Sequence, residues 1–241
     1  MLTNNHKKLI RALKQKKQRD QHGLFVAEGP KVVGEFLAAG YALQHLFTVD
    51  TSLFPGQPCI PVTEAELSAV SYLTTANACL AVFACADNKP LPASGLTVAL
   101  DGVRDPGNLG TIIRLCDWFG ITQLMCSQDT VDCYNPKVVQ ATMGSLARVN
   151  VVYTDLPGYL TDTKLPIFGT FMDGGSVYQA NLPAEGVLVM GNEANGIRPE
   201  VEALVTSRIS IPRFGALQAT ESLNVATATA ILLSEFKRGS G

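Results

Sequence analysis

The hydrophobic pattern of the first 86 residues alternates strand-like and helical stretches at short spacing. A basic stretch predicts an N-terminal helix, and the apolar runs LFVAEG, ALQHLFTV and LAVFACA predict strands. The stretch from Pro30 predicts a helix that ends at Gly40, because glycine is common just after a helix. Thr63 followed by Glu66 is a capping box and predicts another short helix. Residues 1–86 are therefore expected to form a small α/β domain.

A polar segment with two prolines, residues 87–95 (DNKPLPASG), predicts a linker before a second alternating pattern. The runs LTVALD, ITQLMCS, PIFGTF, GVLVMG and SRISIP predict strands. Helices are expected between them, one capped by Asn135 and a last one from about Ser222. This order predicts a parallel sheet covered on both faces, with ligands at the carboxyl ends of the strands. Residues 96–241 are therefore expected to form a second α/β domain.

Composition indicates an ordered globular protein, since hydrophobic residues make up 46% and charged residues 17% of the 241. The formal charge of the whole chain is −2, but residues 1–20 form a basic block that contains seven Lys and Arg residues and one acidic residue. Such a block suits phosphate binding, and it equally suits a solvated helix face or a disordered tail. The basic residues concerned are Lys7, Lys8, Arg11, Lys14, Lys16, Lys17 and Arg19.

The cysteines and histidines bear on compartment and metal binding. The six cysteines contain no CxxC pair and sit mostly among apolar neighbours, which favours buried free thiols in a reducing compartment, the cytoplasm. No Cys and His cluster has the spacing of a metal site, since His6, His22 and His45 all lie in the first domain. The charge-free stretch 67–86 is interrupted by Ser68, Ser71, Thr74, Thr75 and Asn77, so no membrane span is expected.

Three polar loops follow predicted strands, at the edge of the sheet where ligands gather. The first, DGVRDPGNLGTIIR, places Gly110 four residues before Arg114, on one face of the helix that follows. The second, GNEANGI, carries Glu193 between two glycines, and the third runs from IPRFG to a helix that Ser222 or Asn224 could cap. Each loop, taken alone, is also explained by an ordinary turn or helix cap.

Together, in this order, the loops resemble the three motifs of the SpoU or TrmH family of RNA methyltransferases. NLGTIIR resembles the first motif, GNEANGI the second, and IPRFG with ESLNVATATAI the third. The resemblance covers residues 96–238, with one departure, since Ala194 stands where the family usually has glycine. More loosely, RALKQKKQRDQHGLFVAEGPKVV resembles the ribosomal-protein-like RNA-binding domain that precedes the catalytic domain in part of the family.

The resemblance implies a fold and an activity that the residues alone do not give. It implies a C-terminal trefoil knot, a homodimer formed through it, and transfer of a methyl group from S-adenosyl-L-methionine to a ribose 2'-hydroxyl. General topology rules disfavour knots, so the knot rests on the resemblance alone. The resemblance to the accessory domain favours ribosomal over transfer RNA as the substrate. It also implies that the basic residues of the N-terminal block contact RNA.

The resemblance also assigns residues by motif matching. It implies that the cofactor is held by Thr170 and by the backbone around Gly191, Ile211 and Leu223. The implied active-site residues are Asn108, Arg114, Glu193, Ser222 and Asn224.

Arg114 is expected to grip a substrate phosphate and stabilise developing alkoxide charge, because a guanidinium stays protonated and makes a poor base. Asn108 and Glu193 would orient it. Ala194 leaves open a weakened cofactor site, and hence a non-catalytic RNA-binding protein as the alternative. A dinucleotide-dependent oxidoreductase fits poorly, because no GxGxxG follows the first strand of either domain.

Overall fold

The computed structural model describes residues 1–92, 94–215, 217 and 222–238, and it divides into two units. The first unit comprises Met1–Asp87 together with Asp132–Arg148, and the second comprises Asn88–Val131 and the chain from Val149 onward. The predicted domain boundary at 87–95 stays a prediction. The division adds that residues 132–148, which lie inside the predicted second domain, pack with the first unit.

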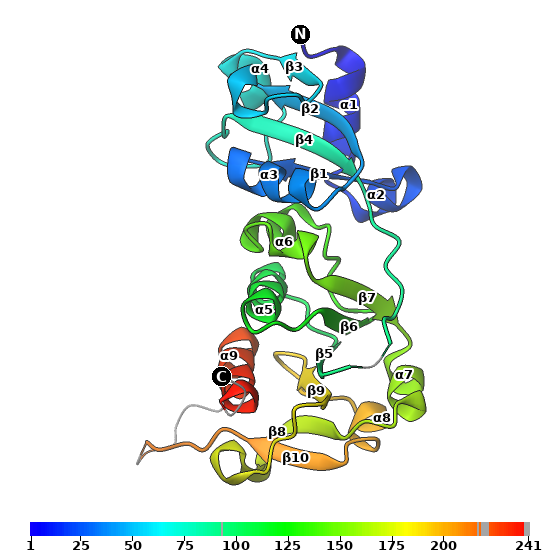
Figure 1. Ribbon diagram of the computed structural model, residues 1–241, viewed down its shortest axis with the longest axis vertical. Coiled ribbons are helices and arrows are strands. Elements are labelled where there is room, and N and C mark those ends of the chain that lie inside the picture. Colours follow the sequence, from blue (N-terminus) through cyan, green and yellow to red (C-terminus); the bar gives the residue numbers. More distant parts are fainter. Residues whose placement is uncertain (93, 216, 218–221, 239–241) are drawn as a thin grey trace. The chain divides into compact units, whose positions relative to one another are not determined.

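The first unit contains a four-stranded sheet in the order β1-β4-β2-β3, which Figure 1 shows among its helices. Only the β2–β3 pair is parallel. The strands are β1 (Leu24–Glu28), β2 (Leu43–Thr48), β3 (Cys59–Pro61) and β4 (Cys79–Ala84), and the helices are α1 (Asn4–Ala12), α2 (Lys16–His22), α3 (Pro30–Ala38), α4 (Glu64–Ser68) and α6 (Pro136–Ala141), with short 3-10 turns at Thr51–Leu53 and Ser145–Ala147.

Local signals account for most of these elements. Thr63 and Glu66 form the predicted capping box of α4, and Gly40 follows α3 with a φ of 79°, a conformation that glycine adopts without strain. The prediction of a single basic N-terminal helix was wrong. The chain forms two separate helices, α1 and α2, and Gln15 precedes α2 in an extended conformation. β3 was not predicted, since a three-residue strand leaves too short a pattern.

The N-terminal helix α1 belongs to the core of the first unit. Ile10 and Leu13 are fully buried and Leu2 is nearly so, and they pack in one cluster with Phe47 and Leu80 of the sheet. The segment 132–148 adds α6, which packs on β1. The beginning of the chain is therefore part of the folded unit rather than a tail.

The second unit is built on a six-stranded, entirely parallel sheet in the order β10-β8-β9-β5-β6-β7. Its strands are β5 (Leu96–Asp101), β6 (Gln123–Ser127), β7 (Asn150–Thr154), β8 (Ile167–Ser176), β9 (Gly186–Gly191) and β10 (Ser207–Ser210). Every residue of β5 and β6 is buried, as expected for central strands of a covered parallel sheet. The predicted α/β class is confirmed, and the knot stays a prediction.

Helices cover both faces of this sheet (Figure 1). They are α5 (Pro106–Trp118), α7 (Leu156–Asp162), α8 (Pro199–Glu202) and α9 (Val225–Lys237), with a 3-10 turn at Val177–Gln179. On one face, Leu156 and Leu160 of α7 and Val201 of α8 pack against Ala99 and Val189 of the sheet. On the other face α5 packs against α9. No helix among the described residues has the length and apolar character that a membrane crossing requires.

Candidate active site

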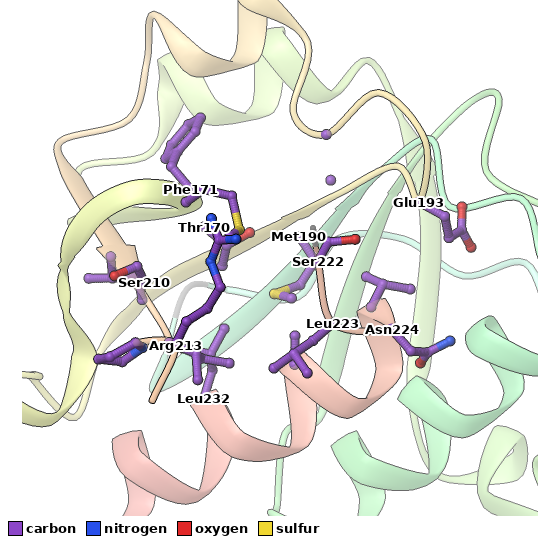
Figure 2. Close-up of a pocket in the computed structure, with 18 of the residues that line it drawn as sticks. Thr170, Phe171, Met190, Glu193, Ser210, Arg213, Ser222, Leu223, Asn224 and Leu232 are labelled. Atoms are coloured by element: carbon purple, nitrogen blue, oxygen red, sulfur yellow. The ribbon is translucent and has the colours of Figure 1, made fainter. Parts of the chain in front are cut away.

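A pocket of about 1050 Å³ lies in the second unit where β9 and β10 end, beside the middle of β8, and the start of α9 closes one side of it (Figure 2). The edge of the sheet is the one that the strand order predicts. All four residues matched to the cofactor, Thr170, Gly191, Ile211 and Leu223, line this pocket. Glu193, Ser222 and Asn224 line it as well.

A chain of hydrogen bonds joins the three predicted loops beside the pocket. The Asn108 side-chain amide donates from Nδ2 to Glu193 Oε1 at 2.9 Å, and the Asn224 amide donates to Asn108 Oδ1 at 2.8 Å. The backbone N–H groups of Arg104 and Asp105 also donate to the Glu193 carboxylate, each at 3.3 Å. One residue from each motif therefore contributes to a single polar network.

The network determines the protonation of Glu193. Partial burial raises the pKa of its carboxyl, but the hydrogen bonds from Asn108 and from the backbone outweigh burial and hold the pKa below its usual value. An ionised carboxylate with this many donors is a weak proton acceptor. Glu193 therefore acts chemically as an anchor for the first loop rather than as a base.

Helix caps fix the two asparagines in different ways. Asp105, and not Asn108, is the N-cap of α5, since its carboxylate accepts the Asn108 N–H at 2.8 Å. This frees the Asn108 side chain to bridge the other two loops. Asn224 caps α9 by accepting from Ala226 N–H at 2.9 Å, so one side chain both starts the helix and joins the network. The last helix consequently begins at Val225, three residues later than predicted.

Arg114 stands apart from the pocket. It is exposed on α5, six residues beyond Asn108, and it is not among the residues that line the pocket. Within the described residues its side chain makes no hydrogen bond or ion pair. Gly110, one turn before it, is buried on the helix that packs against α9. The structure thus brings together four of the five matched active-site residues and leaves Arg114 facing solvent.

The second loop folds back on itself after β9. Asn192 and Gly196 exchange backbone hydrogen bonds at 2.9 and 3.0 Å. A Cβ on Gly191 would come within 2.3 Å of the Gly196 carbonyl carbon, so close packing within the loop requires a glycine there. Ala194 does not have a positive φ, so its methyl group introduces no backbone strain. This departure from the family pattern is therefore accommodated by the loop.

An ion pair between the exposed Arg198 side chain and a buried carboxylate, which the sequence did not indicate, ties this loop to β5. Asp101, the last residue of β5, is buried, and it accepts from the Arg198 backbone N–H and from Arg198 Nε, both at 2.7 Å. Asn192 adds a hydrogen bond to the carbonyl of Gly102 at 2.6 Å. An acid at the end of an apolar strand was the available signal, but its partner lies 97 residues away.

The pocket wall also contains residues that no motif marked. Phe171, Met190 and Leu232 supply apolar surface, and Arg213 supplies a positive charge. Within the described ranges, no three His, Cys, Asp or Glu side chains gather where they could hold a metal ion. An apolar pocket with few polar groups and a large volume is the usual form of a site for a small organic molecule.

Arg19 corrects the expectation for the basic block. Its side chain is only 3% exposed, and it donates to the Asp132 carboxylate at 2.5 and 3.0 Å and to the carbonyls of Leu13 and Lys14. Arg19 is thus a buried structural residue and not an RNA contact, because its donors are used within the first unit. The other six side chains are exposed or half-buried: Lys7, Lys8, Arg11, Lys14, Lys16 and Lys17.

The parallel sheet, the pocket at its carboxyl edge and the three joined loops define an α/β protein that binds a small molecule beside a polar site. Comparison with known proteins identifies the class more closely. Residues 95–234 match the model of the SpoU rRNA methylase family, and residues 4–81 match the substrate-binding domain described as MRM3-like. The chain belongs to the SpoU family of RNA methylases, and the sequence-based resemblance is confirmed.

Individual relatives agree over nearly the whole chain. The chain is 31% identical to the 23S rRNA (guanosine(2553)-2'-O)-methyltransferase RlmP of Bacillus subtilis, with 90% of each chain covered. Among solved structures, a TrmH-family RNA methyltransferase described as putative, from Porphyromonas gingivalis, is 40% identical with a TM-score of 0.90 over 99% of both chains. An AdoMet-bound rRNA methyltransferase from Sinorhizobium meliloti is 31% identical, with a TM-score of 0.87 over 99% of this chain and 96% of that one.

Proposed function

We propose that this protein transfers a methyl group from S-adenosyl-L-methionine to a ribose 2'-hydroxyl of ribosomal RNA. The observation that carries the proposal is the network of Glu193, Asn108 and Asn224, which joins the three motif loops at the mouth of one pocket. RlmP of Bacillus subtilis is named as a 23S rRNA methyltransferase and the Sinorhizobium meliloti neighbour as an rRNA methyltransferase, which favours ribosomal over transfer RNA. A non-catalytic role is disfavoured, because the network is complete and Ala194 is unstrained.

The pocket suits this cofactor in size and chemistry. Its volume of about 1050 Å³ lies just above the roughly 300–1000 Å³ typical of small-molecule sites. Met190, Leu223 and Leu232 offer apolar surface to a purine ring, and Thr170, Gly191 and Ile211 offer polar backbone or hydroxyl groups at the strand ends. We assign these residues to cofactor binding.

The residues of the chain then have distinct tasks. When bound, the cofactor would supply its sulfonium methyl group to the ribose oxygen, with S-adenosyl-L-homocysteine as the leaving group and the hydroxyl proton passing to phosphate or solvent. Asn108, Glu193 and Asn224 hold the first loop against the pocket, which fixes the direction of α5 and hence of Arg114. Arg114 holds the phosphate next to the target ribose and stabilises negative charge on the attacking oxygen. Ser222 lines the pocket next to Asn224, and we assign it to the substrate side of the site.

The proposed reaction is tested by mapping 2'-O-methyl groups in ribosomal and transfer RNA from cells with and without the gene. We expect one ribosomal position to lose its methyl group and to regain it when purified protein and S-adenosyl-L-methionine are added. Loss of a transfer-RNA position instead would reassign the substrate, and no lost position would favour the non-catalytic alternative.

The purified protein is expected to bind S-adenosyl-L-methionine without RNA, because its pocket is formed by one chain. A ligand that binds only the folded state at a hundred times its Kd stabilises that state by about 2.7 kcal/mol. Calorimetry and thermal unfolding would measure this. Absence of both heat and stabilisation at millimolar ligand would contradict the cofactor assignment.

We also propose that exposed basic residues of the first unit bind RNA phosphates. Truncation is unsuitable as a test, because Leu2, Ile10 and Leu13 belong to the core. We expect replacement of Lys8, Lys14 and Lys17 by Gln to weaken RNA binding and to reduce the logarithmic salt slope by roughly 2, at about 0.7 per single-strand phosphate. Filter binding at several salt concentrations measures the slope, which would stay unchanged if these residues were merely solvated.

The assembly and location of the protein are further parts of the proposal. We propose a homodimer in which a second copy brings Arg114 to the pocket, supported by its position outside the pocket of its own chain and by Trp118, which is 84% exposed on the same helix. Light scattering would give the mass. The six free cysteines favour a reducing compartment, which we propose is the cytoplasm.

A further inference from the structure

Among the described residues that line the pocket, one side chain is negatively charged and one is positively charged. The negative side chain is Glu193, whose carboxylate accepts a hydrogen bond from the first loop. The positive side chain is Arg213, which follows β10 on another side of the pocket. Figure 2 shows the Arg213 side chain extending into the pocket in the direction of Thr170, well away from Glu193. The pocket is therefore electrically asymmetric along its length.

The chain before Arg213 is held firmly. β10 pairs with β8, and the Ser210 hydroxyl donates to the Gly174 carbonyl at 2.8 Å. Pro212 then restricts its own backbone and that of Ile211, which favours an extended path out of the strand. The backbone at Arg213 thus leaves the sheet along a restricted path, and the Arg213 side chain lines the pocket.

Arg208, on the same strand, has a different environment. Its guanidinium pairs with Asp173 at 2.6 Å and with Glu202 at 2.5 Å, and it lies over the Phe171 ring at 3.6 Å from the ring centroid. Two carboxylates of the chain neutralise this charge, and the residue does not line the pocket. Arg208 supports the pocket wall through Phe171, whereas Arg213 itself lines the pocket.

We propose that Arg213 binds the carboxylate of the amino-acid part of S-adenosyl-L-methionine and so sets the direction in which the cofactor lies. The inference rests on the proposed function. At neutral pH the cofactor carries one carboxylate and two cationic groups, an ammonium and a sulfonium. A guanidinium binds a carboxylate through paired, charge-assisted hydrogen bonds and repels the cations. The methyl-bearing sulfonium consequently lies away from Arg213, on the side of Asn224 and Glu193.

The test compares two ligands that differ only in this carboxylate: S-adenosyl-L-methionine and its decarboxylated analogue. Calorimetry, or competition where binding is weak, gives both Kd values for the full-length protein and for Arg213→Gln. We expect the wild type to prefer S-adenosyl-L-methionine by about tenfold and Arg213→Gln to lose that preference. Arg213→Lys keeps the charge without the planar fork and should retain part of it.

A matched control is Lys164→Gln, which removes an exposed positive charge from the same unit at a residue that does not line the pocket. It should keep the wild-type preference. The proposal is overturned if Arg213→Gln keeps the preference, or weakens both ligands equally, or lowers only RNA affinity, which would make Arg213 a phosphate contact. Failure of the wild type to bind S-adenosyl-L-methionine at all would instead contradict the proposed function.

Discussion

Replacing Arg114 by alanine is expected to lower the rate of methyl transfer by about a hundred- to a thousandfold, because it removes one well-placed stabiliser of developing charge. S-adenosyl-L-methionine affinity should stay close to that of the wild type, since Arg114 does not line the pocket. The fold should also persist, because the side chain is exposed. Single-turnover rates with saturating RNA and cofactor, alongside calorimetry, measure the two effects separately.

Arg114→Lys distinguishes charge from geometry. A lysine retains a positive charge without a bidentate fork, so it should restore little of the rate if the grip on phosphate is bidentate, and more if charge alone matters. Turnover near the wild-type rate in Arg114→Ala would remove this residue from the active site. It would also remove the main reason for expecting a second copy to complete the active site.

Replacing Arg19 by methionine is expected to destabilise the first unit by about 3 to 5 kcal/mol, the usual cost of removing one partner of a buried ion pair. The Arg19 and Asp132 side chains are 3% and 12% exposed, and the substitution also leaves the carbonyls of Leu13 and Lys14 without their donor. Urea unfolding followed by circular dichroism measures the total. Hydrogen exchange of amides in β1 and α6 assigns the loss to this unit.

Two further variants make the Arg19 result specific. Lys17→Met, at an exposed position of the same helix, should change the stability by no more than about 0.5 kcal/mol. Adding Asp132→Asn to Arg19→Met should recover part of the loss, because no charge is then left buried without a partner. Equal stability of Arg19→Met and the wild type would show that the pair contributes nothing to folding.

The comparison of Arg19 with its neighbours shows what sequence patterns can and cannot predict. Caps, prolines and apolar runs act over a few residues, so the capping box at Thr63 and the cap at Asn135 were predicted correctly. The same local view placed Arg19 with the other basic residues. Its burial depends on Asp132, 113 residues away, and no local pattern carries that information.

The site shows the same division between local and distant information. Motif matching found Asn108, Glu193 and Asn224, and the structure adds that they bond to one another. It did not find Asp101 or Arg213, because one depends on a partner 97 residues away and the other on the direction in which a strand end points. The strand β7 was not predicted, although its residues Val151 and Val152 favour a strand. The segment after the helix capped by Asn135 was given no element of its own.

The first unit is discontinuous in sequence, because residues 132–148 return to it from within the methyltransferase region. A gene fusion that transplanted only residues 1–87 would leave β1 without α6 and Arg19 without Asp132. The substrate-binding unit can therefore be exchanged between enzymes only when both segments are inherited together. Recombination at a single junction would separate these two segments, so an exchange of the first unit has to carry residues 132–148 with it.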